Sequence, residues 1–280
     1  MILGLAFAVI TGGAIHGDTL YTWGDKIMVW ALPKLTYRTV AIPSAPASSG
    51  CLDEANSGLF LQEGDKLIYR RAPDWKSRVI DHGMDMPTCL AATLLGHRGV
   101  LVVHRGMQVR FYEAPDFHYT EIYSFYSRSR QGGLIVTDVD GDGLPDIICG
   151  NYWIKSPTEW NLPWHDFAIE LYNEQPLSAS LRLALVGRDL YVAQGELPDG
   201  LVSRFRKPAD PKQLWIEERL GEFHYPRAFT GRLIGEDNGP QSRLFVDGKP
   251  AGETSGVHTA FPYRDGFVLI GRDGVHLRRR

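Results

Sequence analysis

Four aspartates stand within a short stretch of the sequence, 138-DVDGDGLPD-146. Carboxylates this close repel one another unless a cation lies among them. Oxygen ligands at alternate positions of a tight loop converge on one point, and Gly143 permits the sharp turn that this requires. Ca²⁺, a hard cation of flexible coordination, fits such a set best. The predicted Ca²⁺ ligands are the side chains of Asp138, Asp140, Asp142 and Asp146 and the backbone carbonyl of Leu144.

Two features separate this loop from an EF-hand. Position 12 of the loop is Cys149 rather than Glu, and the apolar residues Ile147 and Ile148 predict a strand instead of a helix. The alternative interpretation is an Asp- and Gly-rich turn that holds no ion. If an ion is bound, a single loop of this kind beside a strand is expected to stiffen the fold rather than to take part in chemistry.

The elements around the loop repeat with a period of about forty residues. Segments 20–42, 59–80 and 101–123 each contain a short apolar strand, a Gly-centred turn, a second alternating strand, a proline and a third strand. Another apolar segment precedes the later units, which makes four short strands in each. Four antiparallel strands repeated radially predict an all-β propeller, with a β-sandwich as the competing fold. The spacing is even, because 40, 42 and 42 residues separate Pro33, Pro73, Pro115 and Pro157.

We expect residues 1–280 to form one propeller domain of seven blades, with six as the alternative. Residues 224–256 contain one clear strand pair and predict a shortened blade. Residues 266–280 match the middle hairpin of the second unit, and no segment for an outer strand follows them in the sequence. We therefore predict that Ile2–Ile10 supplies that strand and closes the ring.

The aspartate loop, together with the apolar strand and the Gly150-Asn151 pair that follow it, resembles the FG-GAP/VCBS type of repeat. This repeat occurs in integrin-α-like propellers and in many secreted bacterial proteins, and the resemblance is specific over residues 132–157. It implies Ca²⁺ in the turn between the first two strands of one blade. It implies no single activity, since the family covers adhesion modules, lectins and some sugar lyases and dehydratases. Segment 236–248 keeps the outline of a second loop but has lost most of its carboxylates.

Composition narrows the partners and the compartment. Thirty Lys+Arg against 33 Asp+Glu give a net charge of −3, which gives no reason to expect nucleic acid or an acidic membrane as a partner. The apolar first ten residues are too short to span a bilayer and lack the cationic start of a secretory signal. The three cysteines, which show no metal-ligand spacing, are expected to be buried free thiols. A Ca²⁺-stabilised fold predicts a secreted or periplasmic protein, because calcium is millimolar there.

Propellers usually bind ligands where the last strand of one blade crosses to the first strand of the next. Crossings are expected near residues 81–88, 124–132, 221–228 and 249–258. Histidine beside a carboxylate and a tyrosine supports acid–base work on a hydroxylated substrate, whereas solvated loop residues are the plainer alternative. The candidate ligand-binding residues on these crossings are Asp85, Arg130, His224, Tyr225, Arg227 and His258.

Two functions compete on this evidence. One is a non-catalytic module that binds a glycan or a protein on its channel face. The alternative is a carbohydrate-active enzyme of the lyase or dehydratase type with its site at the channel mouth. The sequence has no Ser-His-Asp order, phosphate loop, dinucleotide fingerprint or HExxH motif, which favours binding. Near the aspartate loop, Trp153, Trp160 and Trp164 are expected to fill gaps between blades, with stacking on sugar rings as the alternative.

Overall fold

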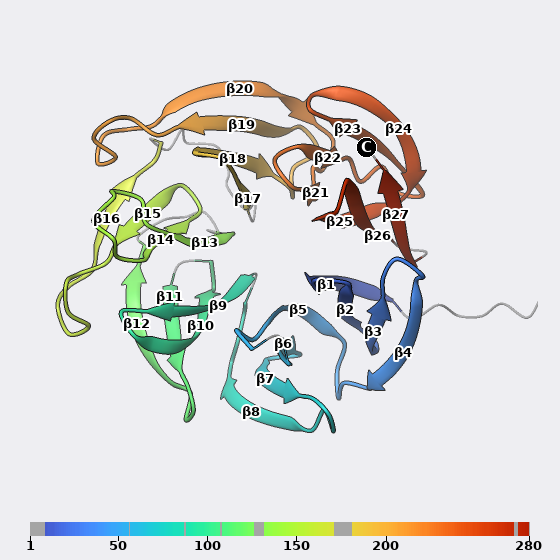
Figure 1. Ribbon diagram of the computed structural model, residues 1–280, viewed down its shortest axis with the longest axis horizontal. Helices are drawn as coiled ribbons and strands as arrows, with labels where there is room; N and C mark the ends of the chain where they lie inside the picture. Colours follow the sequence, from blue (N-terminus) through green and yellow to red (C-terminus); the bar gives the residue numbers. More distant parts are fainter. Residues whose placement is uncertain are drawn as a thin grey trace, which may run out of the picture.

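The computed structural model describes residues 9–55, 57–86, 88–106, 108–125, 132–170, 181–271 and 274–279. Its elements in these ranges are all β-strands, which form seven antiparallel sheets arranged as a ring (Figure 1). The protein is a seven-bladed β-propeller, as the repeat predicts, and the six-bladed alternative is wrong. Within the described ranges no helix has the length and apolar character that a membrane crossing requires.

Each blade follows the chain from the ring's centre outward. Blade 1 is β1 (Ile10–His16), β2 (Thr19–Gly24), β3 (Ile27–Ala31) and β4 (Thr36–Ala41); blade 2 is β5 (Ala47–Leu52), β6 (Gly58–Glu63), β7 (Lys66–Arg71) and β8 (Ser77–His82). Blade 3 is β9 (Thr88–Leu94), β10 (His97–His104), β11 (Gln108–Glu113) and β12 (His118–Ser124); blade 4 is β13 (Leu134–Thr137), β14 (Asp146–Cys149), β15 (Tyr152–Lys155) and β16 (His165–Ala168).

The remaining three blades complete the ring. Blade 5 is β17 (Leu181–Val186), β18 (Asp189–Gln194), β19 (Gly200–Arg206) and β20 (Ile216–Phe223); blade 6 is β21 (Ala228–Phe229), β22 (Leu233–Gly235), β23 (Gln241–Val246) and β24 (Lys249–Ser255). Blade 7 is β25 (Val257–Tyr263), β26 (Gly266–Gly271) and β27 (Gly274–Arg279). The first strands of the blades contact one another in order around the channel, from β1 through β25 and back to β1.

The core lies between blades, because alternate residues of a strand face the two neighbouring sheets. In β26, Val268 and Ile270 pack on blade 1, whereas Phe267 and Leu269 pack on blade 6. The described residues form one such buried cluster at each of the seven junctions. This two-sided packing explains the apolar runs inside the second strands β6 and β10.

Two expectations about the last blades need correction. Residues 224–256 contain a complete four-stranded sheet, but β21 and β22 have only two and three residues, too few for a visible alternation. The ring closes where β1 packs against β25 and β26, and Ile10 pairs with Gly24 inside blade 1 rather than with blade 7. Residues 2–8 of the predicted closing strand fall outside the described residues. Val9 is described, and its carbonyl accepts the Asp25 N–H.

The cysteine prediction is wrong for two of the three residues. Cys51 in β5 and Cys89 in β9 form a disulfide with a Cα–Cα distance of 5.7 Å. They occupy the first strands of consecutive blades, which lie side by side at the channel although 38 residues separate them. Cys149 is a buried free thiol, as expected, and burial raises its pKa to about 12.

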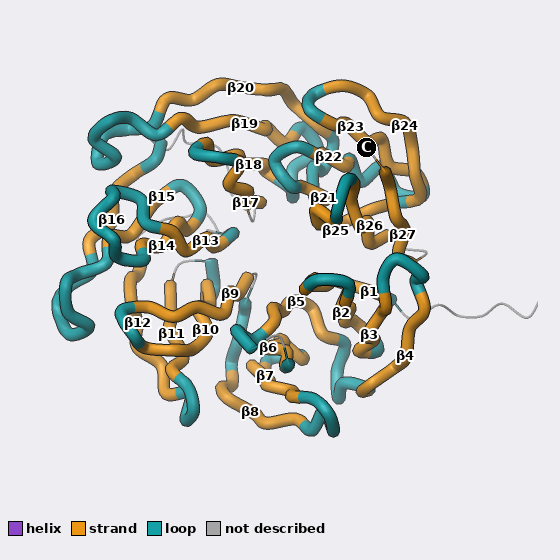
Figure 2. Tube along the Cα trace, in the orientation of Figure 1, coloured by secondary structure: helices purple, strands orange, loops and turns teal. Residues whose placement is uncertain are grey.

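The antiparallel order gives the ring two different faces. Figure 2 shows in teal the loops and turns that join the strands on these faces. The crossings between blades and the turns between second and third strands lie on one face, which we call the crossing face. The turns between first and second strands, and between third and fourth strands, lie on the other. The aspartate loop joins β13 to β14 and is therefore on the face opposite to the crossings.

Candidate functional site

A cavity of about 540 Å³ opens on the crossing face where blades 1, 5, 6 and 7 meet the channel. Ligand pockets in proteins generally have volumes of roughly 300–1,000 Å³. We call it the channel-mouth cavity. Its lining residues come from the starts of first strands and from turns between second and third strands: Val9, Ile10, Thr11, Arg182, Glu196, Arg227, Asp237, His258 and Thr259.

A chain of alternating charges crosses this cavity. Glu196, in the β18–β19 turn, accepts from Arg182 Nη2 at 3.4 Å and from Arg227 Nη2 at 3.0 Å. Arg227, just before β21, also donates its Nη1 to Asp237 Oδ2 at 3.1 Å. The other oxygen of Asp237 accepts the backbone N–H of Gly239. Four side chains from two blades are thus held in one network with no net charge.

Two of the basic groups lie deep in the cavity. Desolvation lowers the pKa of Arg182, and Glu196 partly opposes that effect. About a third of the side chain, 35%, nevertheless remains accessible to solvent. Burial also lowers the pKa of His258, so its imidazole is neutral at neutral pH, and its Nδ1 lies 3.0 Å from Thr259 Oγ1. The cavity is therefore a recess within the protein that solvent still reaches.

The structure brings together two of the predicted channel-face residues, Arg227 and His258, in the channel-mouth cavity. His224 and Tyr225 do not line it. The His224 ring donates Nδ1–H to the Pro198 carbonyl at 2.9 Å. Tyr225 has a positive φ of 44°, and its ring lies 5.2 Å from the Arg227 guanidinium, so it packs behind that residue.

The other two predicted ligand-binding residues are elsewhere. Asp85 is in the crossing from β8 to β9, where its carbonyl accepts the Arg105 N–H at 2.7 Å, and it does not line the channel-mouth cavity. Arg130 lies outside the described residues.

Sequence reasoning missed three charged residues of the cavity. Glu196 and Asp237 are in turns between second and third strands, which reach the same face as the crossings, and Arg182 begins a first strand. A signal from the topology was available for Arg182 and Glu196, because each stands at the crossing-face end of a recognised strand, but not for Asp237, because β22 is too short to be recognised. Asp237 belongs to the segment that resembled a second calcium loop, but that segment follows β22 and so lies on the opposite face from Asp138.

The aspartate loop brings three carboxylates together. One oxygen each of Asp138, Asp140 and Asp146 lie within 4.8 Å of one another. Asp146 is fully buried and accepts the N–H groups of Val139 and Ser156 at 2.9 and 2.8 Å. Burial raises the pKa of Asp146 despite these two bonds.

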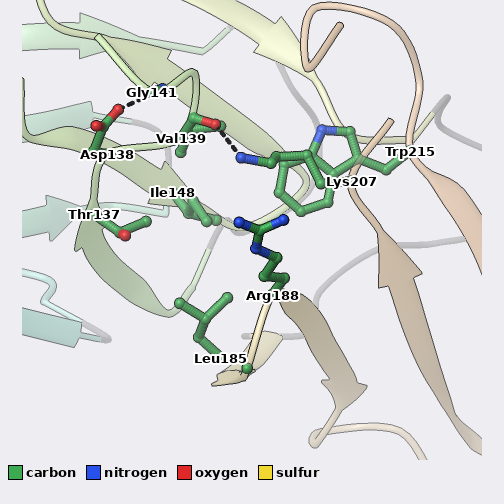
Figure 3. Close-up of a pocket in the computed structure, with 10 residues that line it drawn as sticks. Thr137, Asp138, Val139, Gly141, Ile148, Leu185, Arg188, Lys207 and Trp215 are labelled. Carbon is green, nitrogen blue, oxygen red and sulfur yellow. Dashed lines mark hydrogen bonds between the residues drawn. The ribbon is translucent and has the colours of Figure 1, made fainter. Parts of the chain in front are cut away.

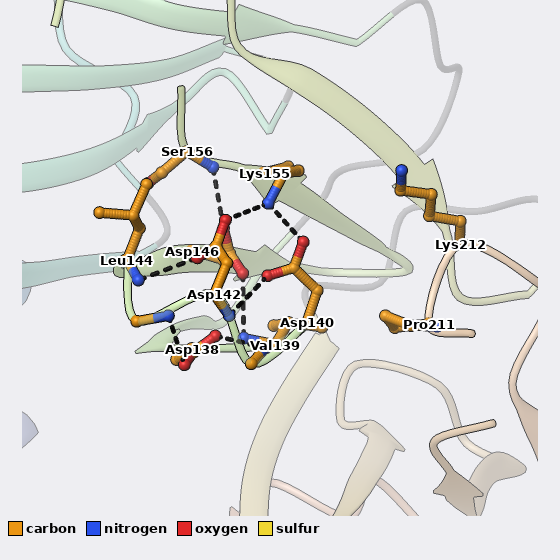
Figure 4. Close-up of polar contacts among 12 residues, drawn as sticks. Asp138, Val139, Asp140, Asp142, Leu144, Asp146, Lys155, Ser156, Pro211 and Lys212 are labelled. Atoms are coloured by element: carbon orange, nitrogen blue, oxygen red, sulfur yellow. Dashed lines mark hydrogen bonds and ion pairs between the residues drawn. The ribbon is translucent and has the colours of Figure 1, made fainter. Parts of the chain in front are cut away.

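A lysine supplies the loop with a positive charge (Figure 4). The Lys155 ammonium, at the end of β15, contacts both Asp140 and Asp142. Burial works against the charge of Lys155, but these contacts outweigh it and raise its pKa; the lysine in turn lowers the pKa of Asp142. The Leu144 N–H donates to Asp142 Oδ1 at 2.9 Å.

The donor set fits Ca²⁺ in chemistry, because oxygen ligands from alternate residues converge in one small loop. Lys155 competes with such an ion for two of the four carboxylates. Asp138, Asp140 and Asp146 would hold the ion, and a bound cation would supply charge neutralisation to the turn.

A second cavity, of about 330 Å³, lies beside this loop between blades 4 and 5 (Figure 3). Arg188 and Lys207 point into it, and Lys207 Nζ donates to the Val139 carbonyl at 2.5 Å. The tryptophans of this region fill gaps between blades: Trp153 is fully buried against blade 5, and Trp160 and Trp164 pack on the cluster between blades 3 and 4.

Comparisons with known proteins point to the fold. No family model and no curated protein matches the sequence. The chain is similar in structure to the Cps50 (Swd1) β-propeller domain of Myceliophteria thermophila, with 15% identity, a TM-score of 0.67, and coverage of 98% of this chain and 96% of that one. A similarity at this level of sequence identity establishes the fold alone, which is a β-propeller.

Two further structures resemble the chain. The extracellular domain of the one component system BT4673 from B. thetaiotaomicron gives 12% identity and a TM-score of 0.66 over 99% of this chain and 39% of that one. BamB from Moraxella catarrhalis gives 12% identity and a TM-score of 0.53, covering 96% and 85%. The FG-GAP/VCBS resemblance stays a prediction from the aspartate loop.

Proposed function

We propose that the protein is a non-catalytic binding propeller that holds a glycan in the channel-mouth cavity. The observation that carries this is the mixture of polar groups in one cavity: arginine donors, carboxylate acceptors and threonine hydroxyls line it together. Sugar hydroxyls both donate and accept hydrogen bonds, so a site with both kinds of partner suits them. The aliphatic side chains of Val9 and Ile10 offer the apolar contact that most ligand pockets provide.

We place this activity outside the cytoplasm. Disulfides persist in oxidising compartments and are rare in cytosolic proteins. The Cys51–Cys89 bond supports a secreted or periplasmic location. One of the similar structures is described as an extracellular domain, which agrees with that assignment.

Blocking the cavity is expected to abolish glycan binding. Thr259→Trp places an indole inside the channel-mouth cavity without removing any of its charged groups. Binding on a glycan array should fall to background, while the melting temperature changes little. His258→Ala is expected to weaken glycan binding on the array, because the His258 imidazole lines the cavity.

His224→Ala is the matched control, since His224 bonds to Pro198 outside the cavity, and it should bind as the wild type does. Glycan binding that survives Thr259→Trp would contradict the proposal. The proposal would also be contradicted if a protein, and no glycan, bound in the cavity. Turnover of a bound saccharide would show that the propeller is an enzyme instead.

Calcium is expected to stabilise the aspartate loop, and Lys155→Met is expected to enlarge the effect. An ion at a hundred times its dissociation constant stabilises a protein by about 2.7 kcal/mol. Calcium must displace the Lys155 ammonium from Asp140 and Asp142 in the wild type, but not in the variant. The rise in melting temperature between EGTA and saturating CaCl₂ should therefore be larger for Lys155→Met.

Lys76→Met provides the comparison, because Lys76 pairs with Asp74 on the surface, away from the loop. It should show the same calcium response as the wild type. If neither the wild type nor Lys155→Met responds to calcium, the loop is not a calcium site and Lys155 is its permanent counter-charge.

A further inference from the structure

In the channel-mouth cavity the carboxylates are engaged by donors within the protein, and a buried nitrogen donor is left without a partner. Both oxygens of Glu196 accept from arginines, and both oxygens of Asp237 accept from Arg227 and from a backbone N–H. Meanwhile Arg227 Nε is buried with no hydrogen-bond partner among the described residues. The His258 ring is a weaker case, because its Nε2 lacks a partner of regular geometry but a hydrogen bond with the Ile10 backbone partly opposes the effect of burial, which lowers the His258 pKa. Buried polar groups in folded proteins are normally paired, so a ligand that brings a hydrogen-bond acceptor would satisfy this unpaired donor.

Within this neutral network, Arg182 makes a longer contact with Glu196 than Arg227 does. A guanidinium offers five N–H donors, and Glu196, its carboxylate partner here, is shared with Arg227 at a shorter distance. The exposed third of Arg182 belongs to a side chain that lines the cavity. Arginine prefers carboxylates, which it binds through two parallel hydrogen bonds.

We infer that the ligand of this cavity is an acidic sugar whose carboxylate is bound by Arg182. This rests on the proposed glycan-binding function and specifies the ligand class. The carboxylate supplies the acceptor that the cavity lacks. The hydroxyls of the same sugar donate to Glu196 and exchange hydrogen bonds with Thr259, so both kinds of group on the ligand have partners.

The test compares sugars that differ only at C6, where a carboxylate replaces the hydroxymethyl group. Galacturonate and galactose, and glucuronate and glucose, are titrated against the wild type and Arg182→Gln by calorimetry at low ionic strength. We expect each acid to bind the wild type at least tenfold more tightly than its neutral counterpart. Arg182→Gln should lose that preference, so that each acid binds it no more tightly than its neutral counterpart does.

Arg204→Gln is the matched control. Arg204 lies in the same blade, is 32% exposed and pairs with Asp189 and Glu218, but does not line the cavity. It should retain the full preference for the acids. A second variant, Arg182→Lys, keeps the charge without the planar fork and should recover only part of it.

The possible failures are distinguishable. If the neutral sugars bind the wild type as tightly as the acids, and Thr259→Trp abolishes both, the glycan site stands and the carboxylate inference is wrong. If no saccharide responds to Thr259→Trp, the proposed function fails with it. The C-terminal carboxylate of a peptide is the other possible ligand. A short peptide with a free C-terminus is therefore titrated in parallel with its amidated form. Arg182-dependent binding of the free peptide, without binding of the sugar acids, overturns the assignment to sugars.

Discussion

Replacing both Cys51 and Cys89 by alanine is expected to lower the free energy of unfolding by about 4 kcal/mol. The bond closes a loop with a sequence separation of 38 residues, and the loss of chain entropy in the unfolded state predicts this magnitude. For a protein of this size, roughly 2–4 °C of melting temperature corresponds to 1 kcal/mol, so the transition should fall by roughly 8–16 °C. Differential scanning calorimetry of the two proteins measures the shift.

A reducing agent separates the bond from the side chains. It should lower the melting temperature of the wild type and leave that of the double variant unchanged. Under denaturing conditions, a thiol assay should find only the Cys149 thiol before reduction. An equal response of both proteins to the reducing agent would show that Cys51 and Cys89 are not bonded, and would remove one support for a location outside the cytoplasm.

The architecture was readable from the sequence because a propeller repeats one local pattern. The second strand of a blade is buried on both faces, so apolar runs such as 59-LFLQE-63 and 100-VLVVH-104 recur. A proline follows the third strand at Pro33, Pro73 and Pro115. Blade 6 departs from that pattern because its two inner strands are too short to alternate, and only the ring as a whole shows that it is complete.

The contacts between blades were not readable in the same way. Cys51 and Cys89 stand in first strands of consecutive repeats, and only the ring shows that these strands are neighbours. The cavity has the same difficulty, since Arg182, Glu196 and Asp237 come from separate strands and turns. Arg227 and His258 were found because both lie at crossings, where the topology alone indicates a shared face.

Blade 2 contains an arginine–glutamate pair with a different environment from that of the cavity. Arg70 donates Nε and Nη2 to the two oxygens of Glu63 at 2.7 and 3.1 Å, and the side chains are only 9% and 1% exposed. The remaining groups also have partners, because Arg70 Nη1 donates to the Trp75 carbonyl and the Ser44 N–H donates to Glu63. Each of the three Arg70 nitrogens therefore has an acceptor within the protein, and the pair is closed off from solvent.

Arg70→Met is therefore expected to destabilise the protein by roughly 3–5 kcal/mol, because it leaves the Glu63 carboxylate buried without its partner. Urea denaturation measures the loss. Removing both charges, as Glu63→Leu with Arg70→Met, should restore much of it, since an apolar pair of similar volume is often as stable as a buried ion pair. Arg232→Met is the control: Arg232 makes the same two-bond contact with Asp247 on the surface, and its loss should hardly change the transition.

The comparison with Arg182 then separates a structural pair from a binding pair. Arg70→Met should reduce stability and, under conditions where the protein is folded, leave the affinity for an acidic sugar intact. Arg182→Gln should do the reverse, because Arg182 is a third exposed in the cavity and shares its carboxylate partner with Arg227. If Arg182→Gln instead destabilises the fold as strongly as Arg70→Met, the charge network of the cavity serves to hold blades 5 and 6 together, and its unpaired donor does not mark a binding site.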